Sequence, residues 1–204
     1  MVRRVLRPEP LAFVERAPLR LIHTAGLSAP PDAVFAELAE HPEDWPRWFT
    51  AIREAGYAGS PPYGAGTGRV IRLRGGVRFV ETVIAWEPGE RYAYRVEETN
   101  APGVRALVEE WRLAPGPDGS GTQVTWTMAV DCVPPAGALL GRSRGPLRRV
   151  FAEAAARLDE RAGRRGIPDP RTGAEPDSEP DSEPASEPGA GGAAAPEERN
   201  QTVR

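Results

Sequence analysis

Hydrophobic and polar residues alternate along most of the chain between positions 19 and 131. Alternation with a period of two is typical of strands that bury one face. Glycine-rich turns such as Gly75-Gly76 separate several runs, which favours hairpins between neighbours. The pattern therefore predicts a curved, seven-stranded antiparallel sheet, with strands at Leu19–Leu27 and at residues 51–58, 68–74, 77–86, 91–97, 104–113 and 122–131.

Residues 29–49, between the first two predicted strands, have the features of two short helices. Pro30 and Pro31 suit a first helical turn, where no backbone donor is needed, and Pro42 is expected to end that helix. Apolar residues then share one face of each helix: Val34, Phe35 and Leu38 in the first, and Trp45, Trp48 and Phe49 in the second. We expect the first set to anchor its helix to the sheet and the second to close the mouth of a pocket.

A long amphipathic helix is predicted after the last strand. Its apolar positions recur with helical spacing at Leu147, Val150, Phe151, Ala154 and Leu158. One such helix can cover a sheet, but it cannot fill the concave face of seven twisted strands. The order of elements therefore predicts an α+β fold with space between sheet and helix.

The end of the chain differs in composition from the rest. Residues 168–204 carry nine acids and three arginines, a net charge of −6, whereas the whole chain of 204 residues has −3. Such a Pro-, Ser-, Glu-, Gly- and Ala-rich segment has too little to bury to offset the entropy of ordering. We therefore expect an irregular segment at residues 1–17, one domain at 18–166 and a disordered acidic tail at 167–204.

Several classes of protein lack support in the sequence. Cys132 is the only cysteine and there are two histidines, so neither a disulfide framework nor a transition-metal site is expected, and no cofactor is predicted. The mildly basic domain has no dense basic face that would favour nucleic acid. No signal peptide or transmembrane span is recognised, so a cytoplasmic location is the default expectation.

Several local motifs resemble those of the START-like (SRPBCC) superfamily, which has the Bet v 1-like helix-grip fold, and of its polyketide cyclase/dehydrase group. These motifs lie at residues 28–35, 45–49, 64–68, 83–94 and 121–126. The resemblance covers roughly residues 18–163 and implies an internal cavity for a hydrophobic or aromatic small molecule. Binding of such a molecule is the first functional hypothesis, because motifs of this kind identify a fold better than an activity. The alternatives are a polyketide cyclase or aromatase, a quinone or lipid carrier, and an interaction module that uses the acidic tail.

The facing residues follow from the assumed turns. If Gly75-Gly76 is a two-residue turn, Arg72 lies opposite Phe79 and on the same face as Glu81. A bulge would invert part of this assignment. The expected ligand-binding set is aromatic and aliphatic with few polar members: Trp45, Trp48, Phe49, Arg72, Phe79, Glu81, Tyr92, Tyr94, Glu109, Trp111, Trp126, Met128 and Phe151.

Four inward residues are candidates for catalysis if the protein is an enzyme. Arg72 or Tyr92 would polarise a carbonyl group, and His23 or Glu81 would transfer a proton. Each also has a structural interpretation: Arg72 and Glu81 as an ion pair, and His23 as a core histidine.

Overall fold

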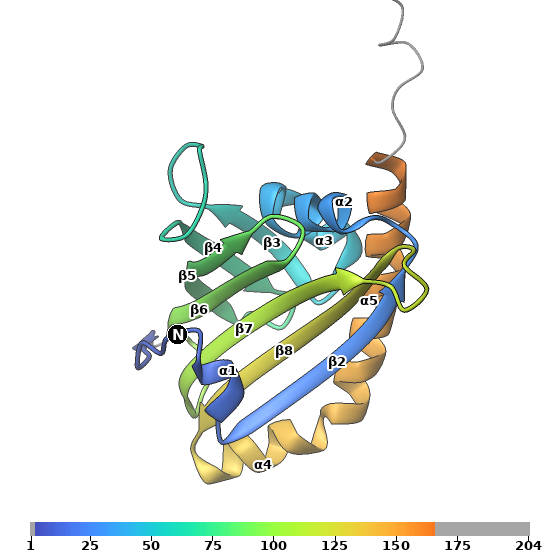
Figure 1. Ribbon diagram of the computed structural model, residues 1–204. Helices are drawn as coiled ribbons and strands as arrows, with labels where there is room; N and C mark the ends of the chain where they lie inside the picture. Colours follow the sequence, from blue (N-terminus) through green and yellow to red (C-terminus); the bar gives the residue numbers. More distant parts are fainter. Residues whose placement is uncertain (1–2, 166–204) are drawn as a thin grey trace, which may run out of the picture. The chain divides into compact units, whose positions relative to one another are not determined.

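The computed structural model describes residues 3–165 (Figure 1). From β2 onward its elements follow the predicted order of one strand, short helices, six strands and a long helix. They are β1 (Arg4–Val5), α1 (Phe13–Arg16), β2 (Leu19–Leu27), α2 (Pro31–Phe35), the π-helical turn η1 (Ala36–Glu40), the 3-10 turn η2 (Pro42–Asp44), α3 (Trp45–Trp48), β3 (Ile52–Tyr57), β4 (Gly68–Leu73), β5 (Arg78–Glu87), β6 (Arg91–Thr99), β7 (Val104–Pro115), β8 (Thr122–Cys132), α4 (Pro134–Arg142) and α5 (Arg144–Arg165).

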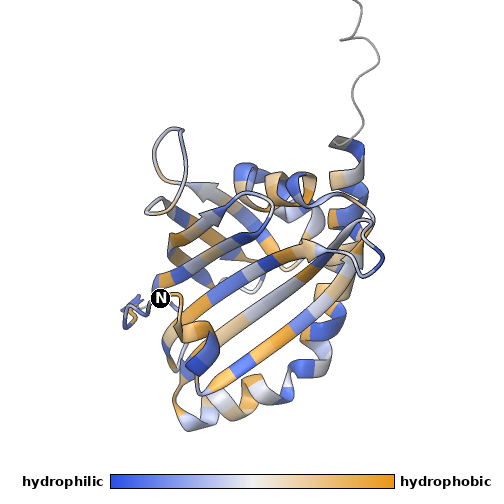
Figure 2. Ribbon diagram, viewed as in Figure 1, coloured by the Kyte–Doolittle hydropathy of each residue, from blue (hydrophilic) through white to orange (hydrophobic). Residues whose placement is uncertain are grey.

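The strands form one antiparallel sheet in the order β2-β8-β7-β6-β5-β4-β3. Strands β3 to β8 form a meander, and β2 pairs with β8 as the strand at the opposite edge from β3. Hydrophobic and polar residues alternate along β2 in Figure 2, as expected for a strand with one buried face. The predicted seven-stranded antiparallel sheet and long C-terminal helix are thus confirmed.

The N-terminal segment is more ordered than expected. β1 pairs with the end of β6, and Leu6 N continues this pairing by donating to Glu97 O at 2.8 Å. The next residue reaches β7, since Arg7 N donates to Arg105 O, also at 2.8 Å. The following helical turn, α1, packs Phe13 and Val14 against the outer face of β7 and β8. Both sides of the middle of the sheet are therefore covered.

The main core lies between the inner face of the sheet and the helices α2, α3 and α5. It contains the residues that were expected to anchor the helices, including Val34, Phe35 and Leu38 from the short helices and Phe151 and Leu158 from α5. All of these side chains are buried. The helical periodicity read from the sequence therefore places the correct faces against the sheet.

Two polar side chains of α5, Asp159 and Arg161, join this helix to the segment that follows β2. The Asp159 carboxylate accepts hydrogen bonds from the backbone nitrogens of Ser28 (2.8 Å) and Ala29 (2.9 Å). Arg161 donates to Glu37 (2.9 Å) and to Asp44 (2.6 Å). These contacts set where the short helices lie along α5.

The tail predicted for residues 167–204 lies outside the described residues. Within residues 3–165, no helix is both long and apolar enough to cross a membrane.

We predict that Arg161→Ala lowers the free energy of unfolding by about 3 kcal/mol, because the fully buried Glu37 carboxylate loses this guanidinium. Arg164→Ala, an exposed arginine on the same helix, is the matched control and should change stability by less than about 0.5 kcal/mol. Urea unfolding measures both. Equal effects of the two substitutions would show that the contact does not stabilise the fold.

Candidate functional site

The β4–β5 turn has three residues rather than two. The Leu73 nitrogen donates to the Val77 carbonyl oxygen at 2.8 Å, and Gly76 has a φ of 82°, so the loop is formed by residues 74–76. A three-residue hairpin with a final left-handed glycine is a common form. A change of one residue in register moves every side chain of a strand to the other face.

The placement of Arg72 on the inner face is therefore wrong. Arg72 is exposed, with 48% of its side chain accessible, and it pairs with Glu54 at 3.0 Å. Arg69 takes the inner position instead, directly opposite Glu81. The sequence correctly predicts that an arginine shares the inner face with Glu81, but this arginine is Arg69 and not Arg72.

Arg69 is completely buried, and its charge is compensated on several sides. Its Nε donates to Glu81 Oε2 at 2.7 Å and its Nη1 donates to the Tyr92 hydroxyl at 3.0 Å. The guanidinium carbon lies 4.4 Å from the ring centroid of Trp45 and 3.9 Å from that of Tyr94. Burial lowers the pKa of Arg69, but the Glu81 charge and the tyrosines outweigh it, so the pKa is raised and the group stays charged.

Glu109 is a second buried carboxyl group on the same side of the sheet. Its Oε2 accepts hydrogen bonds from the Tyr94 hydroxyl (2.8 Å) and the Trp126 indole (3.0 Å), whereas Oε1 has no hydrogen-bond partner among residues 3–165. Burial and, secondly, the Glu81 charge raise the pKa of Glu109 to about 7. This carboxyl therefore titrates near neutral pH.

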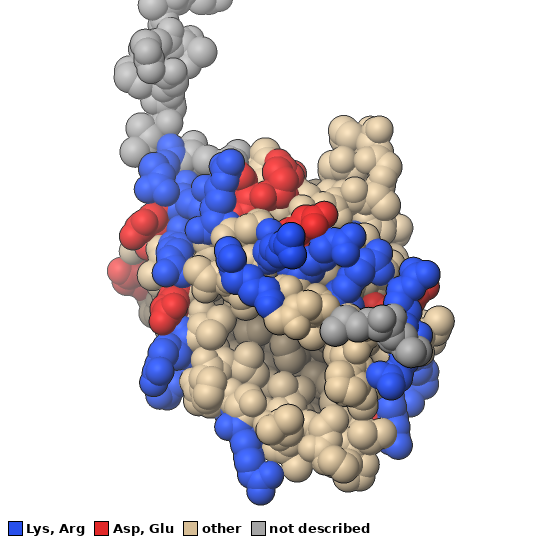
Figure 3. Space-filling view, turned by 180° about the vertical axis from the view of Figure 1, so that it is seen from behind, with Lys and Arg blue, Asp and Glu red and all other residues tan. Residues whose placement is uncertain are grey.

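A cavity of about 190 Å³ lies above these groups. Arg69, Glu81 and Glu109 are buried residues of its lining. Several other lining residues, such as Leu147 and Val150, are partly exposed and lie toward the solvent. Figure 3 shows a hollow in the molecular surface, surrounded by neutral side chains, with arginines above it. The other lining residues are nearly all apolar: Trp45, Phe49, Ala51, Ile52, Ile71, Leu73, Phe79, Tyr94, Trp126, Met128, Leu147 and Val150.

Eight of the thirteen expected ligand-binding residues lie in this lining: Trp45, Phe49, Phe79, Glu81, Tyr94, Glu109, Trp126 and Met128. Trp48, Trp111 and Phe151 are buried in the aromatic core around it. Tyr92 is also buried, with its hydroxyl bonded to Arg69 and, at 2.8 Å, to Tyr57. His23 faces inward but lies outside the cavity, where its ring contacts Trp126 and Phe151.

The expected set left out seven lining residues: Ala51, Ile52, Arg69, Ile71, Leu73, Leu147 and Val150. Three of them, Arg69, Ile71 and Leu73, lie on β4. Ile71 and Leu73 were a usable signal, because their side of the strand is more apolar than the side of Val70 and Arg72. The arginine at position 69 argued against this side as the inner one, since an arginine is seldom fully buried. In β5, a bulge between Val83 and Ala85 similarly moves Trp86 to the inner side.

Among residues 3–165, no group of three or more His, Cys, Asp or Glu side chains is placed to hold a metal ion.

Comparison with known families identifies the domain. Residues 21–163 match the family described as polyketide cyclase / dehydrase and lipid transport. The chain belongs to this family. An uncharacterized protein of Mycobacterium tuberculosis strain H37Rv is 39% identical over 126 residues, which are 62% of this chain and 74% of that protein. The resemblance to the START-like superfamily is thus confirmed.

Solved structures show that this polyketide cyclase / dehydrase family member shares its fold with START-like proteins. A START superfamily protein from Mycobacterium smegmatis has a TM-score of 0.56 and 14% identity, over 71% of this chain and 97% of that chain. The Zhui aromatase/cyclase from Streptomyces sp. R1128 has a TM-score of 0.58 and 18% identity, over 74% of this chain and 96% of that chain. At such low identity the likeness concerns the fold alone.

We predict strong coupling between Arg69 and Glu81. Arg69→Met should lower the free energy of unfolding by about 4 kcal/mol, because it leaves the buried Glu81 without its partner. The double variant Arg69→Met/Glu81→Gln should lose less than the sum of the single changes, with a coupling energy of about 2 kcal/mol in urea unfolding.

The exposed pair Arg72 and Glu54 is the control for this cycle. The corresponding changes Arg72→Met and Glu54→Gln should couple by less than about 1 kcal/mol, because water screens the charges. Additive effects at Arg69 and Glu81 would contradict the ion pair.

We predict a pH-dependent stability difference between the wild-type protein and Glu109→Gln. The folded state holds the Glu109 proton up to a pKa of about 7, against 4.5 for an ordinary glutamate, so this contribution is complete below pH 4.5 and is lost as the pH rises through about 7. As the pH rises across this range, the free energy of unfolding of the variant should therefore increase relative to that of the wild type by up to about 3 kcal/mol. Urea unfolding at several pH values measures the difference.

Glu110→Gln is the control, since Glu110 is a buried neighbour that pairs with Arg91 and Arg112 outside the cavity. The stability difference between Glu110→Gln and the wild type should not show the same increase with pH. A Glu109→Gln difference that is constant with pH would contradict the assignment.

Proposed function

We propose that this domain binds a small hydrophobic molecule, with one aromatic ring or two, that carries a single hydroxyl or carbonyl group. The observation that supports this most directly is the apolar cavity with the Glu109 carboxyl group in its wall. Pockets for small molecules are typically apolar with a few polar groups that fix orientation. The family description, which includes lipid transport, is compatible with binding without chemistry.

The volume of the cavity limits the size of the ligand. An apolar cavity of roughly 150 Å³ can accept benzene, whereas pockets for drug-sized ligands start at roughly 300 Å³. At about 190 Å³, this cavity suits a molecule of one or two rings. A poly-β-ketone chain or a long lipid would require it to widen, so cyclase activity and lipid carriage are less well supported.

Glu109 supplies the polar selectivity in this proposal. Arg69 and Glu81 are 0% and 3% accessible and are engaged with each other, while Glu109 is 8% accessible and has a free oxygen among the described residues. The ionised carboxylate can accept a hydrogen bond from a ligand hydroxyl, and the protonated form can donate one to a carbonyl. With a pKa of about 7, both forms are available near neutral pH.

The candidates for catalysis named from the sequence do not converge at one point. Arg72 is exposed, His23 lies outside the cavity, and Tyr92 is buried behind it. Only Glu81 lines the cavity, and it is bonded to Arg69. This arrangement favours binding over catalysis.

We predict that 4-fluorophenol binds saturably, followed by its ¹⁹F NMR signal. Above pH 7 it should bind more tightly than fluorobenzene, because its hydroxyl can donate to ionised Glu109. Ala51→Phe should weaken the binding of both probes by about tenfold or more, because Ala51 lines the cavity and the added ring occupies it.

Ala156→Phe is the matched control, since Ala156 is exposed on α5 and outside the cavity lining. It should leave both affinities unchanged. Absence of saturable binding, or equal binding to the wild type and Ala51→Phe, would reject the proposed site.

A further inference from the structure

A second, basic groove lies between the edge strand β2 and the first half of α5. It has a volume of about 280 Å³ and is lined by Arg20, Leu21, Ile22, His23, Arg144 and Arg148. A water molecule takes roughly 30 Å³ in the liquid, so the groove has room for a small anion and several waters. Arg148 also lines the adjoining groove, together with Arg149.

His23 belongs to the lining of this groove and has an unsatisfied nitrogen. The residue is 8% exposed, and its Nε2 is buried without a hydrogen-bond partner among residues 3–165. Its ring contacts Trp126 and Phe151, with centroid distances of 5.7 and 5.6 Å. Buried polar nitrogens normally have a partner, so a water molecule or a bound ion in the groove is the natural partner for a side chain in its wall.

The charges around His23 are predominantly positive. Arg144 and Arg148 are exposed and make no ion pair within the described part of the chain. Arg20 uses one nitrogen to pair with Glu15 at 3.2 Å, while its Nε is buried without a partner in the same range. Burial and, secondly, Arg148 lower the pKa of His23. An isolated positive groove of this kind is stabilised by a bound anion.

We propose that the groove between β2 and α5 is a binding site for a phosphate-type oxyanion, held by Arg144 and Arg148 with His23 at its floor. Planar guanidinium groups suit such oxyanions because each can donate two parallel hydrogen bonds. The anion comes either from a free molecule or from a lipid headgroup, since the groove recognises the same oxygen atoms in both. The site is separate from the cavity, and Trp126 lies between the two by contacting His23 and lining the cavity.

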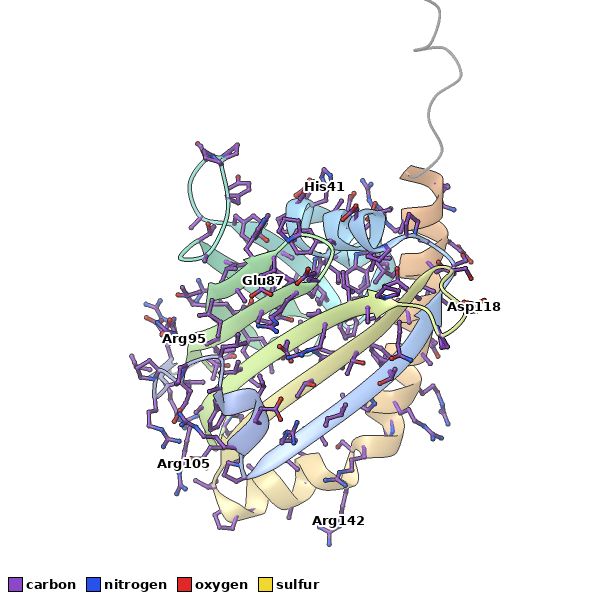
Figure 4. All side chains as sticks on the ribbon, viewed as in Figure 1. His41, Glu87, Arg95, Arg105, Asp118 and Arg142 are labelled. Carbon is purple, nitrogen blue, oxygen red and sulfur yellow. The ribbon has the colours of Figure 1, made fainter. Side chains whose placement is uncertain are left out.

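The two histidines of the chain provide the readout. Figure 4 shows His41 beside the short helices, and Glu43 lies 3.6 Å from it, so it reports on a different place. Sodium sulfate, whose charge is constant through neutral pH, is titrated against sodium chloride of equal ionic strength while the ring protons are followed by NMR. The His23 signal should shift saturably and its pKa should rise, because a bound anion stabilises the imidazolium. The His41 signal should respond equally to both salts.

Two double variants with the same change of charge test the arginines. Arg144→Gln/Arg148→Gln should weaken sulfate binding by about tenfold or more, as seen from the His23 signal. Arg53→Gln/Arg164→Gln, two exposed arginines outside the groove, should leave it unchanged. Circular dichroism checks that both variants are folded.

Sedimentation with phosphatidylcholine vesicles, with and without phosphatidylglycerol, identifies the source of the anion. Sulfate binding without sedimentation supports a free oxyanion. Sedimentation that requires phosphatidylglycerol and is lost in Arg144→Gln/Arg148→Gln supports a headgroup. A His23 signal that does not distinguish sulfate from chloride, together with vesicle binding that is equal in both double variants, would overturn the proposal.

Discussion

The ion pair between Arg69 and Glu81 is the interaction on which the interior of this domain depends. Both side chains are almost completely buried, and Arg69 Nε lies 2.7 Å from Glu81 Oε2. A buried charge without a partner is strongly destabilising, so the groups around it must keep their positions. The Trp45 and Tyr94 rings and the Tyr92 hydroxyl all contact the same guanidinium. Because Trp45 belongs to α3, this one cation joins the short helix to β4, β5 and β6.

The ion pair also determines what remains available in the cavity. Glu81 is bonded to Arg69, whereas Glu109 is held only through one oxygen by Tyr94 and Trp126. The Glu81 charge adds to burial in raising the pKa of Glu109. The Glu81 carboxylate, which is bonded to Arg69, therefore helps to set the pKa of Glu109. Glu109 is then the polar group of the cavity wall that is left to bind a ligand.

The family and the fold leave room for such differences. Members of a common fold differ in function through the side chains they place on it, and here those side chains lie on the strands that face α5. The groove on the other side of Trp126 uses the same helix, since α5 contributes Leu147 and Val150 to the cavity and Arg144 and Arg148 to the groove. Alternating apolar and basic residues on α5 thus serve two separate surfaces.

The sequence by itself determined the seven main strands, the short helices after β2 and the long C-terminal helix, in their order, because alternation and helical spacing depend on local geometry. It did not reveal β1 and α1, which are too short to show a periodicity. It placed Val124, Trp126 and Met128 on the inner face of β8 and Phe151 on the apolar face of α5, since these positions are apolar without exception. The tertiary structure decided which arginine is buried. The three-residue turn at 74–76 shifted β4 by one residue, and only the pairing with Glu81 and the surrounding rings makes Arg69 tolerable inside. Register is a non-local property, and compensation of a buried charge depends on partners from distant parts of the chain.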